Sequence, residues 1–129
     1  MASTFRLEHV AIPAQGELFN ETLTFYQQMF GMEVIREVSG GRQHFAFLSD
    51  GSGGVIEVLD VEGPALPAPS HLAFMVPLAA FEETRSQLAE RGIAFDPVVE
   101  NDSGDLIAYF RDPAGNTAQV IGRREPLGS

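Results

Sequence analysis

Residues 50–59 read DGSGGVIEVL, and residues 112–121, sixty-two positions further on (112 − 50 = 62), read DPAGNTAQVI. Each stretch joins a D-x-x-G turn to a mostly apolar strand. Three pairs of positions keep this spacing: Asp50 and Asp112, Gly53 and Gly115, and Glu57 and Gln119. A turn and a strand that recur at one fixed spacing indicate that the chain contains an internal repeat.

The same spacing relates two histidines near the start of each half (71 − 9 = 62). His9 lies within LEHVAI, residues 7–12, and His71 begins HLAFMV, residues 71–76. Each stretch is followed by a proline, which is a common end point for a strand because proline has no N–H to donate. Each half therefore begins with a predicted strand.

The rest of each half reads alike. One helix is predicted from a cap at Asn20 to Phe30 and another from about Ala80 to Arg91, each followed by a glycine. Three strands then complete each half: near 33–38, 43–48 and 54–59, then near 95–99, 105–110 and 117–121. The pattern predicts a single α+β domain over residues 1–129, in which two tandem βαβββ modules form a curved mixed-sheet cup around one site. Module one covers about 5–60, a Pro-rich linker 61–70, and module two about 71–122.

Composition excludes several classes of protein. Eighteen acidic against eight basic residues give a net charge of −10, which disfavours nucleic acid and anionic membranes as partners. Cysteine is absent, so disulfide scaffolds and thiolate zinc sites are excluded. No apolar run approaches the ~20 residues of a membrane helix, and the first residues do not resemble a signal peptide. We therefore expect a cytoplasmic protein without a membrane partner.

Four polar side chains occupy equivalent, otherwise apolar strand faces: His9, Glu57, His71 and Gln119. Taken singly, His9 is more simply a hydrogen-bonded core histidine, Glu57 a partly exposed strand carboxylate, and Gln119 a residue without a role. Burying a carboxylate is costly unless a partner compensates it, and the repeat would bring all four groups to one point. Two imidazoles, a carboxylate and an amide oxygen suit one divalent metal ion per chain, which could be Zn, Ni, Mn, Co or Fe.

Several further stretches resemble the vicinal oxygen chelate superfamily, which includes glyoxalase I, methylmalonyl-CoA epimerase, extradiol dioxygenases and bleomycin-binding proteins. The stretches are LEHVAI at 7–12, FYQQMFGMEV at 25–34, SHLAF at 70–74 and YFRDPAGN at 109–116. The resemblance implies that the metal ligands lie on the first and last strands of each module. In this chain those positions are His9, Glu57, His71 and Gln119.

The order His, Glu, His and a fourth ligand resembles bacterial-type glyoxalase I, whose fourth ligand is a second glutamate. The resemblance implies a lyase or isomerase that acts on a small substrate chelating the metal through vicinal oxygens. Gln119 replaces that glutamate and cannot accept a proton, so Glu57 becomes the candidate catalytic base. Tyr109 either lines the substrate site or belongs only to the core. Many relatives are dimers, which implies a homodimer.

Two alternatives stay open. An extradiol-type dioxygenase would use iron held by two histidines and Glu57, although the dioxygenase signature expects glutamate at Gln119. A metal-free protein of the bleomycin-resistance type would use an apolar groove instead. Outside the candidate site, we expect His44 to be an exposed strand residue and the acidic stretch 100–105 to face solvent.

Overall fold

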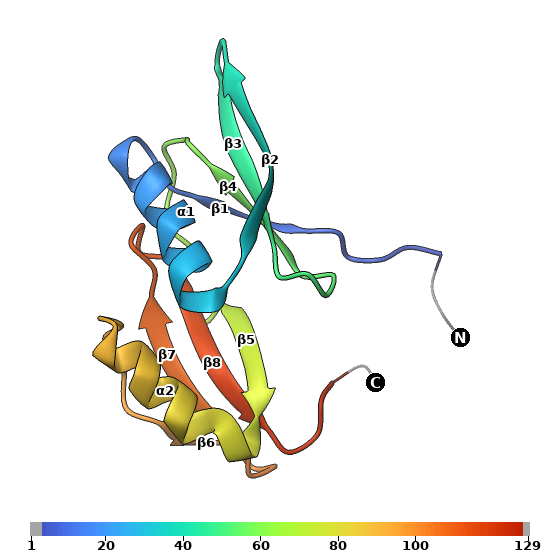
Figure 1. Cartoon of the computed structure of the whole chain (residues 1–129), viewed down its shortest axis with the longest axis vertical. Helices are drawn as coiled ribbons and strands as arrows, with labels where there is room; N and C mark the ends of the chain where they lie inside the picture. The colour runs from blue at the N-terminus through green and yellow to red at the C-terminus, as the bar shows by residue number, and fades with distance from the viewer. Residues whose placement is uncertain (1–3, 128–129) are drawn as a thin grey trace. The chain divides into compact units, whose positions relative to one another are not determined.

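The computed structural model describes residues 4–127. The chain divides into two compact units, Met1–Ala65 and Leu66–Ser129. Each unit has a four-stranded mixed sheet and one main helix, in the order strand, helix, three strands (Figure 1). The predicted α+β class with two similar βαβββ modules is therefore confirmed.

Unit 1 contains β1 (Val10–Pro13), α1 (Glu17–Phe30), β2 (Glu33–Gly40), β3 (Gln43–Ser49) and β4 (Val55–Leu59). Its strands lie in the order β1-β4-β3-β2. β4 is parallel to β1, where Ala11 is paired with Glu57, and antiparallel to β3, where Phe47 is paired with Glu57. The register therefore places Glu57 on an inner strand between two apolar residues.

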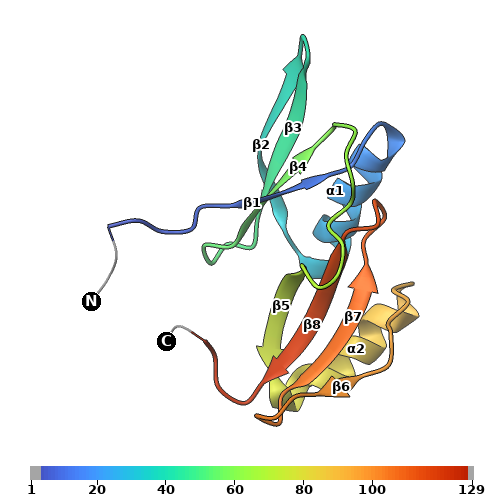
Figure 2. The same cartoon turned by 180° about the vertical axis from the view of Figure 1, so that it is seen from behind.

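Unit 2 contains β5 (Leu72–Pro77), the short 3₁₀ helix η1 (Leu78–Ala80), α2 (Phe81–Glu90), β6 (Val99–Glu100), β7 (Leu106–Arg111) and β8 (Thr117–Arg123). Its strand order, β5-β8-β7-β6, matches that of unit 1 (Figure 2). β8 is parallel to β5, where Ala73 is paired with Gln119, and antiparallel to β7, where Tyr109 is paired with Gln119. Gln119 thus occupies in unit 2 the sheet position that Glu57 occupies in unit 1.

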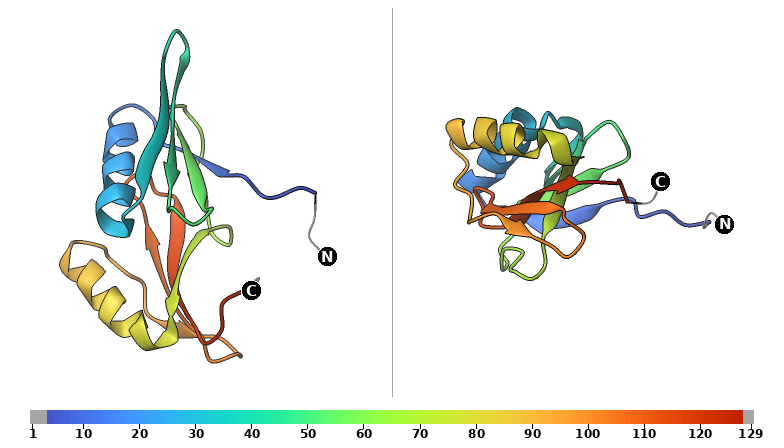
Figure 3. Two further views of the ribbon diagram at one scale, coloured as in Figure 1. Left: turned by 45° about the vertical axis from the view of Figure 1, so that its right-hand side comes forward. Right: turned by 90° about the horizontal axis from the view of Figure 1, so that it is seen from below.

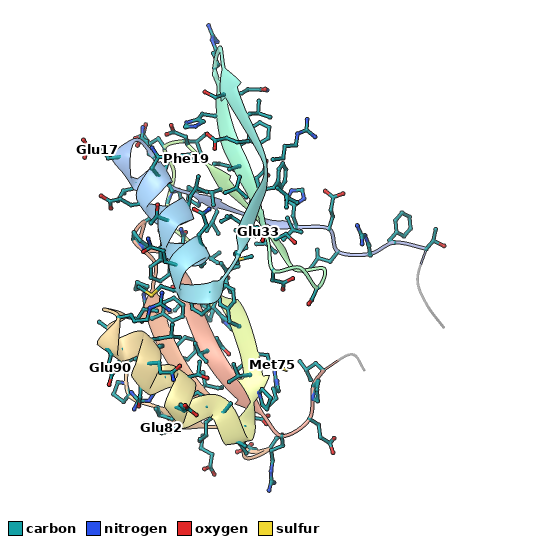
Figure 4. The ribbon with its side chains drawn as sticks, in the orientation of Figure 1. Glu17, Phe19, Glu33, Met75, Glu82 and Glu90 are labelled. Atoms are coloured by element: carbon teal, nitrogen blue, oxygen red, sulfur yellow. The ribbon has the colours of Figure 1, made fainter. Side chains whose placement is uncertain are left out.

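In each unit the helix covers one face of the sheet (Figure 3). Phe19 of α1, labelled in Figure 4, stacks on His44 of β3 with ring centroids 4.0 Å apart, so the alternate residues Ala46 and Leu48 also face α1 and are fully buried. In unit 2, Gly122 faces Phe81 at the start of α2. No helix within residues 4–127 is long and apolar enough to cross a membrane.

The D-x-x-G turns have the same structure in both units. Asp50 Oδ1 accepts hydrogen bonds from the backbone N–H groups of Ser52 (2.7 Å) and Gly54 (2.9 Å). Asp112 Oδ1 accepts the equivalent bonds from Ala114 and Asn116, both at 2.9 Å. These bonds keep the sixty-two-residue spacing, so the internal repeat extends to individual hydrogen bonds.

Helix α1 begins at Glu17, not after a cap at Asn20, and that prediction was wrong. The residue before the helix is Gly16, whose φ of 63° favours glycine. Its N–H donates to Asp60 Oδ1 at 2.7 Å. The residue that anchors the start of this helix is thus a carboxylate just after β4, far away in the sequence.

Two strand boundaries also differ from the prediction. β1 starts at Val10 instead of Leu7, because its pairing with β4 begins there, opposite Ile56. The strand predicted near 95–99 is reduced to the two residues of β6. Pro97 has no N–H to donate to a neighbouring strand, which limits pairing in this stretch.

Candidate functional site

His9 and Glu57 lie together on the face of unit 1 that points away from α1. Nε2 of His9 is 3.3 Å from Oε1 of Glu57, and their side chains are 32% and 16% exposed. The His9 ring also contacts Phe47 edge to face, with ring centroids 5.3 Å apart. A histidine and a carboxylate thus share a partly buried, mostly apolar sheet face.

The other nitrogen of His9 is hydrogen-bonded to the preceding residue. Nδ1 lies 3.0 Å from Oε1 of Glu8, an exposed carboxylate. Both ring nitrogens therefore face carboxylates, Glu8 at Nδ1 and Glu57 at Nε2, and a neutral imidazole can donate to only one of them. A cation bound by Nε2 and by Glu57 would let Nδ1 donate to Glu8 and would leave neither carboxylate facing a lone pair.

In unit 2, Gln119 and His71 lie on the face of the sheet that points away from α2. Gln119 is buried, at 3% exposure, and His71 is exposed. His71 lies two residues before Ala73, the β5 partner of Gln119, and so is on the same face. Its ring contacts Tyr109 edge to face at 5.8 Å. Within residues 4–127 the fully buried side-chain polar atom without a partner is Thr22 Oγ1, not an atom of Gln119, so what points to a ligand role for Gln119 is its sheet position equivalent to that of Glu57.

The tautomer of His71 is set by a backbone carbonyl. Nδ1 of His71 lies 2.9 Å from the backbone oxygen of Pro69, which can only accept. Nδ1 therefore carries the proton and Nε2 is available as a ligand. Metal-bound histidines usually show this arrangement, with the second ring nitrogen donating to a carboxylate or carbonyl oxygen.

The two sets of residues are related by the internal repeat. His9 and Glu57 are here called the first candidate half-site, and His71 and Gln119 the second. Phe47 and Tyr109, which contact the two histidines, also obey the sixty-two-residue spacing (109 − 47 = 62). Neither unit, within residues 4–127, gathers three His, Asp or Glu side chains that could hold a metal ion by themselves.

Histidine 44, which we expected to be exposed, belongs to a charged cluster on the other face of the unit 1 sheet. It is half-buried beneath Phe19. Its Nδ1 is 2.9 Å from Asp60 Oδ2 and its Nε2 is 3.2 Å from Glu37 Oε2. The hydrogen bonds to Asp60 and then to Glu37 raise the pKa of His44, while the Gly16 N–H and then His44 lower the pKa of Asp60.

The acidic stretch 100–105 does not face solvent throughout. Asp105 is buried and accepts hydrogen bonds from the Arg124 N–H (2.9 Å) and from Arg123 Nη1 (3.1 Å). The bond from the Arg124 backbone is the main cause that lowers the pKa of Asp105. Through these hydrogen bonds Asp105 connects the end of β8 to the loop before β7, so its role is structural.

Solved structures with the same fold were found. A glyoxalase family protein from Enterococcus faecalis is 29% identical, with a TM-score of 0.74 and coverage of 92% of this chain and 98% of that one. The oxidase ChaP-H2 is 26% identical, with a TM-score of 0.70 and 98% of both chains covered. The fosfomycin resistance protein FosX from Listeria monocytogenes, complexed with Mn(II) and 1S,2S-dihydroxypropylphosphonic acid, is 19% identical (TM-score 0.78; 95% and 93% covered).

No curated protein sequence is similar enough to count as a relative of this chain. A family model, however, matches residues 6–120, which include both half-sites and nearly all of both sheets. The chain therefore belongs to the Glyoxalase/Bleomycin resistance protein/Dioxygenase superfamily.

Proposed function

We propose that this chain is a metal-dependent enzyme of the glyoxalase type. It would act as a lyase or isomerase on a small substrate that binds the metal through two adjacent oxygen atoms. The observation that carries the proposal is the 3.3 Å separation of His9 Nε2 and Glu57 Oε1, on an otherwise apolar sheet face.

That separation is the one expected of two ligands on one ion. Metal–nitrogen and metal–oxygen bonds of about 2.1 Å place two ligand atoms about 3.4 Å apart when the angle at the metal is tetrahedral, close to the 3.3 Å found here. Glu8 is placed to accept a proton from Nδ1 of His9, which would leave Nε2 for the ion. The first half-site could therefore bind a metal with only small movements.

The second half-site would complete the set of ligands. Nε2 of His71 is left available by the hydrogen bond to Pro69, and the oxygen of the Gln119 amide is a suitable neutral ligand. Two imidazoles, one carboxylate and one amide oxygen suit Zn, Ni, Mn, Co or Fe and leave positions for a substrate. One divalent ion per chain follows, with both units contributing to each site.

The ion would supply Lewis acidity toward a substrate that presents two adjacent oxygens. Glu57 is the only carboxylate in the proposed ligand set, so it is the group we assign to proton transfer. Gln119 cannot take that role, because an amide does not accept a proton at neutral pH. Tyr109, which contacts His71, would bind the substrate beside the ion.

The known structures support a divalent ion and a substrate of this kind. FosX is complexed with Mn(II) and with a phosphonic acid that carries hydroxyl groups on adjacent carbons. We also expect this chain to form a homodimer and to bind neither nucleic acid nor membranes, in line with its net charge of −10.

A ring-cleaving dioxygenase is the second candidate. His9, Glu57 and His71 are two histidines and one carboxylate, the set that holds iron in many oxygenases. The similarity to the oxidase ChaP-H2 favours keeping this candidate. The identity of the bound metal would separate the two functions, because the dioxygenase requires iron.

Metal content of untagged protein tests the proposal, since a histidine tag would itself bind metal. Wild type, His71→Ala and His44→Gln are purified side by side and analysed by mass spectrometry. We expect about one ion per chain in wild type and in His44→Gln, whose histidine lies on the other sheet face. His71→Ala should lose most of it.

The metal then selects the substrate screen. Zn, Ni, Mn or Co would lead to α-ketoaldehydes and epimerase substrates, and iron to oxygen consumption with catechols. If wild type bound no metal even after incubation with Zn, Ni, Mn and Fe salts, the enzyme proposal would be wrong. A metal-free ligand-binding protein would then be the better explanation.

A further inference from the structure

The segment that leads into β1 reaches beyond the sheet of unit 1. β1 and β4 are parallel, and their pairing begins with Val10 opposite Ile56. β4 begins at Val55, one residue before Ile56, directly after the turn closed by the hydrogen bond from Asp50 N–H to Gly54 O. Residues 6–8, here called the leading segment, belong to no strand and run outward from the sheet (Figures 1 and 2).

The leading segment has the side-chain pattern of a strand that lacks a neighbour. Leu7 is 82% exposed, although it is a large apolar residue. Arg6 and Glu8 lie on either side of it and are also exposed. In an extended chain they point to the opposite side from Leu7, so opposite charges flank one apolar position. Oε1 of Glu8 lies 3.0 Å from His9 Nδ1, and its Oε2 is the oxygen left for a second partner. Such a segment is a good template for pairing with another strand.

We propose that the leading segment pairs with the same segment of a second copy of this chain, as two antiparallel strands related by a two-fold axis at Leu7. This arrangement places Arg6 of each copy opposite Glu8 of the other. Leu7 meets Leu7 across the axis. The inference extends the expected homodimer and does not depend on a metal.

The charges favour this arrangement over others. Opposite charges stabilise directly opposed strand positions, and like charges destabilise them. A parallel, in-register pairing would place Arg6 against Arg6 and Glu8 against Glu8. The antiparallel pairing makes two opposite-charge contacts, because a two-fold interface repeats each contact. The segment is therefore complementary to itself in one orientation only.

The net charge of the chain allows specific pairing to be distinguished from overall repulsion. Each copy carries −10, so two copies repel one another at long range. Arg6→Glu would make that repulsion stronger, and Glu8→Arg would make it weaker. If overall repulsion controlled dimerisation, these two changes would act in opposite directions. Specific pairing predicts that both weaken the dimer.

Sedimentation velocity over a concentration series measures the effect on untagged, full-length protein. We expect wild type to dimerise, and Arg6→Glu or Glu8→Arg alone to raise the dissociation constant roughly tenfold or more. An equimolar mixture of the two variants should dimerise as tightly as wild type, because the mixed pair has opposite charges at both contacts. The double variant, with both changes in one chain, should recover for the same reason.

Two charge reversals elsewhere serve as matched controls. Arg42→Glu, in the turn between β2 and β3, and Glu21→Arg, on α1, change exposed residues by the same charge. They should leave the dissociation constant within about threefold of wild type, as expected for isolated surface charges. Circular dichroism would verify that all variants are folded.

Three results would overturn the proposal: a wild type that stays monomeric at every concentration, a dimer that neither single change weakens, or a mixture no tighter than its components. Metal content measured on wild type and Arg6→Glu keeps the two proposals separate. A protein that binds metal but shows any of these three results would retain the proposed function and lose this interface.

Discussion

At the scale of single residues, Glu57 is proposed both as a metal ligand and as the catalytic base, and one substitution can separate these two roles. Glutamine has nearly the same shape as glutamate and can still offer an oxygen ligand, but it cannot accept a proton. Glu57→Gln should therefore keep most of the bound metal and lose turnover by about 10²–10⁴-fold on the substrate found by screening. Metal content and steady-state rates measure the two effects.

Glu33→Gln provides the control for that experiment, because Glu33 is an exposed carboxylate at the start of β2. Its metal content and rate should match those of wild type. Unchanged turnover in Glu57→Gln with the metal retained would show that Glu57 is not the base.

His44 gives a second prediction at this scale, concerning pH. The pKa of His44 is raised by its bonds to Asp60 and Glu37, so the stability it contributes is present below the unfolded value of about 6.5 and is lost as the pH rises through the folded pKa. Phe19, the α1 residue that packs on the ring, carries no charge. Wild type should therefore exceed His44→Gln in stability most at about pH 5.5, and the difference should shrink toward pH 9.

Asp60, the carboxylate partner of His44, determines the lowest pH at which the pair still stabilises the folded state. The pKa of Asp60 is lowered, so its contribution is present above 3.8 and is lost as the pH falls further. Urea unfolding of wild type and His44→Gln at several pH values measures the difference. If the difference in free energy of unfolding between the two proteins stayed constant or grew between pH 6 and 9, His44 would not be protonated in the cluster.

At the scale of elements, the contact between β8 and α2 explains a glycine inside a strand. A Cβ at Gly122 would lie 2.7 Å from Cβ of Phe81, which is fully buried. Gly122→Ala should therefore lower the free energy of unfolding by about 1–3 kcal/mol, because strand and helix must move apart. Urea denaturation measures this loss.

Gly63→Ala is the matched substitution, since an added Cβ there has no atom within 4 Å and the backbone is not in the left-handed region. Its free energy of unfolding should change by no more than about 1 kcal/mol, toward greater stability if at all. Equal losses in the two variants would show that the Gly122 contact is not tight.

The elements that sequence predicts well are those whose signal is local. Alternating apolar residues and D-x-x-G turns locate most strands, and Gly31 ends α1 in the left-handed conformation as predicted. The start of α1 depends on Asp60, a distant residue, so a search for nearby caps selected Asn20 instead. Local patterns cannot reveal a hydrogen-bond acceptor that lies 44 residues away in the sequence.

Some features of the candidate site are likewise predicted by the sequence, and others are not. The repeat predicts that His9 and Glu57 belong to one set, and the register brings them together in unit 1. The hydrogen bond of His71 to a backbone carbonyl has no signature in the residue types, nor does the cluster around His44. Both depend on how strands are arranged in space.

At the scale of the whole molecule, the question is which two half-sites combine. Each chain has one half-site in unit 1 and one in unit 2, and a dimer could join them within a chain or between chains. The proposed pairing at Leu7 brings equivalent segments of the two copies together, so it selects neither arrangement. The two arrangements differ in whether the His9 and His71 of one site belong to one chain or to two.

Mixing two defective variants distinguishes these arrangements, and recovery of metal is the result expected of a site shared between chains. His9→Ala retains the second half-site and His71→Ala retains the first, so neither variant alone should bind about one metal per chain. After subunit exchange, half of the dimers contain one chain of each kind and one intact shared site, giving about one ion per four chains. Mass spectrometry of the mixture, against each variant incubated alone, measures the recovery. If the mixture bound no more metal than its components while remaining dimeric, each chain would build its own site, and the leading segment would join two independent centres.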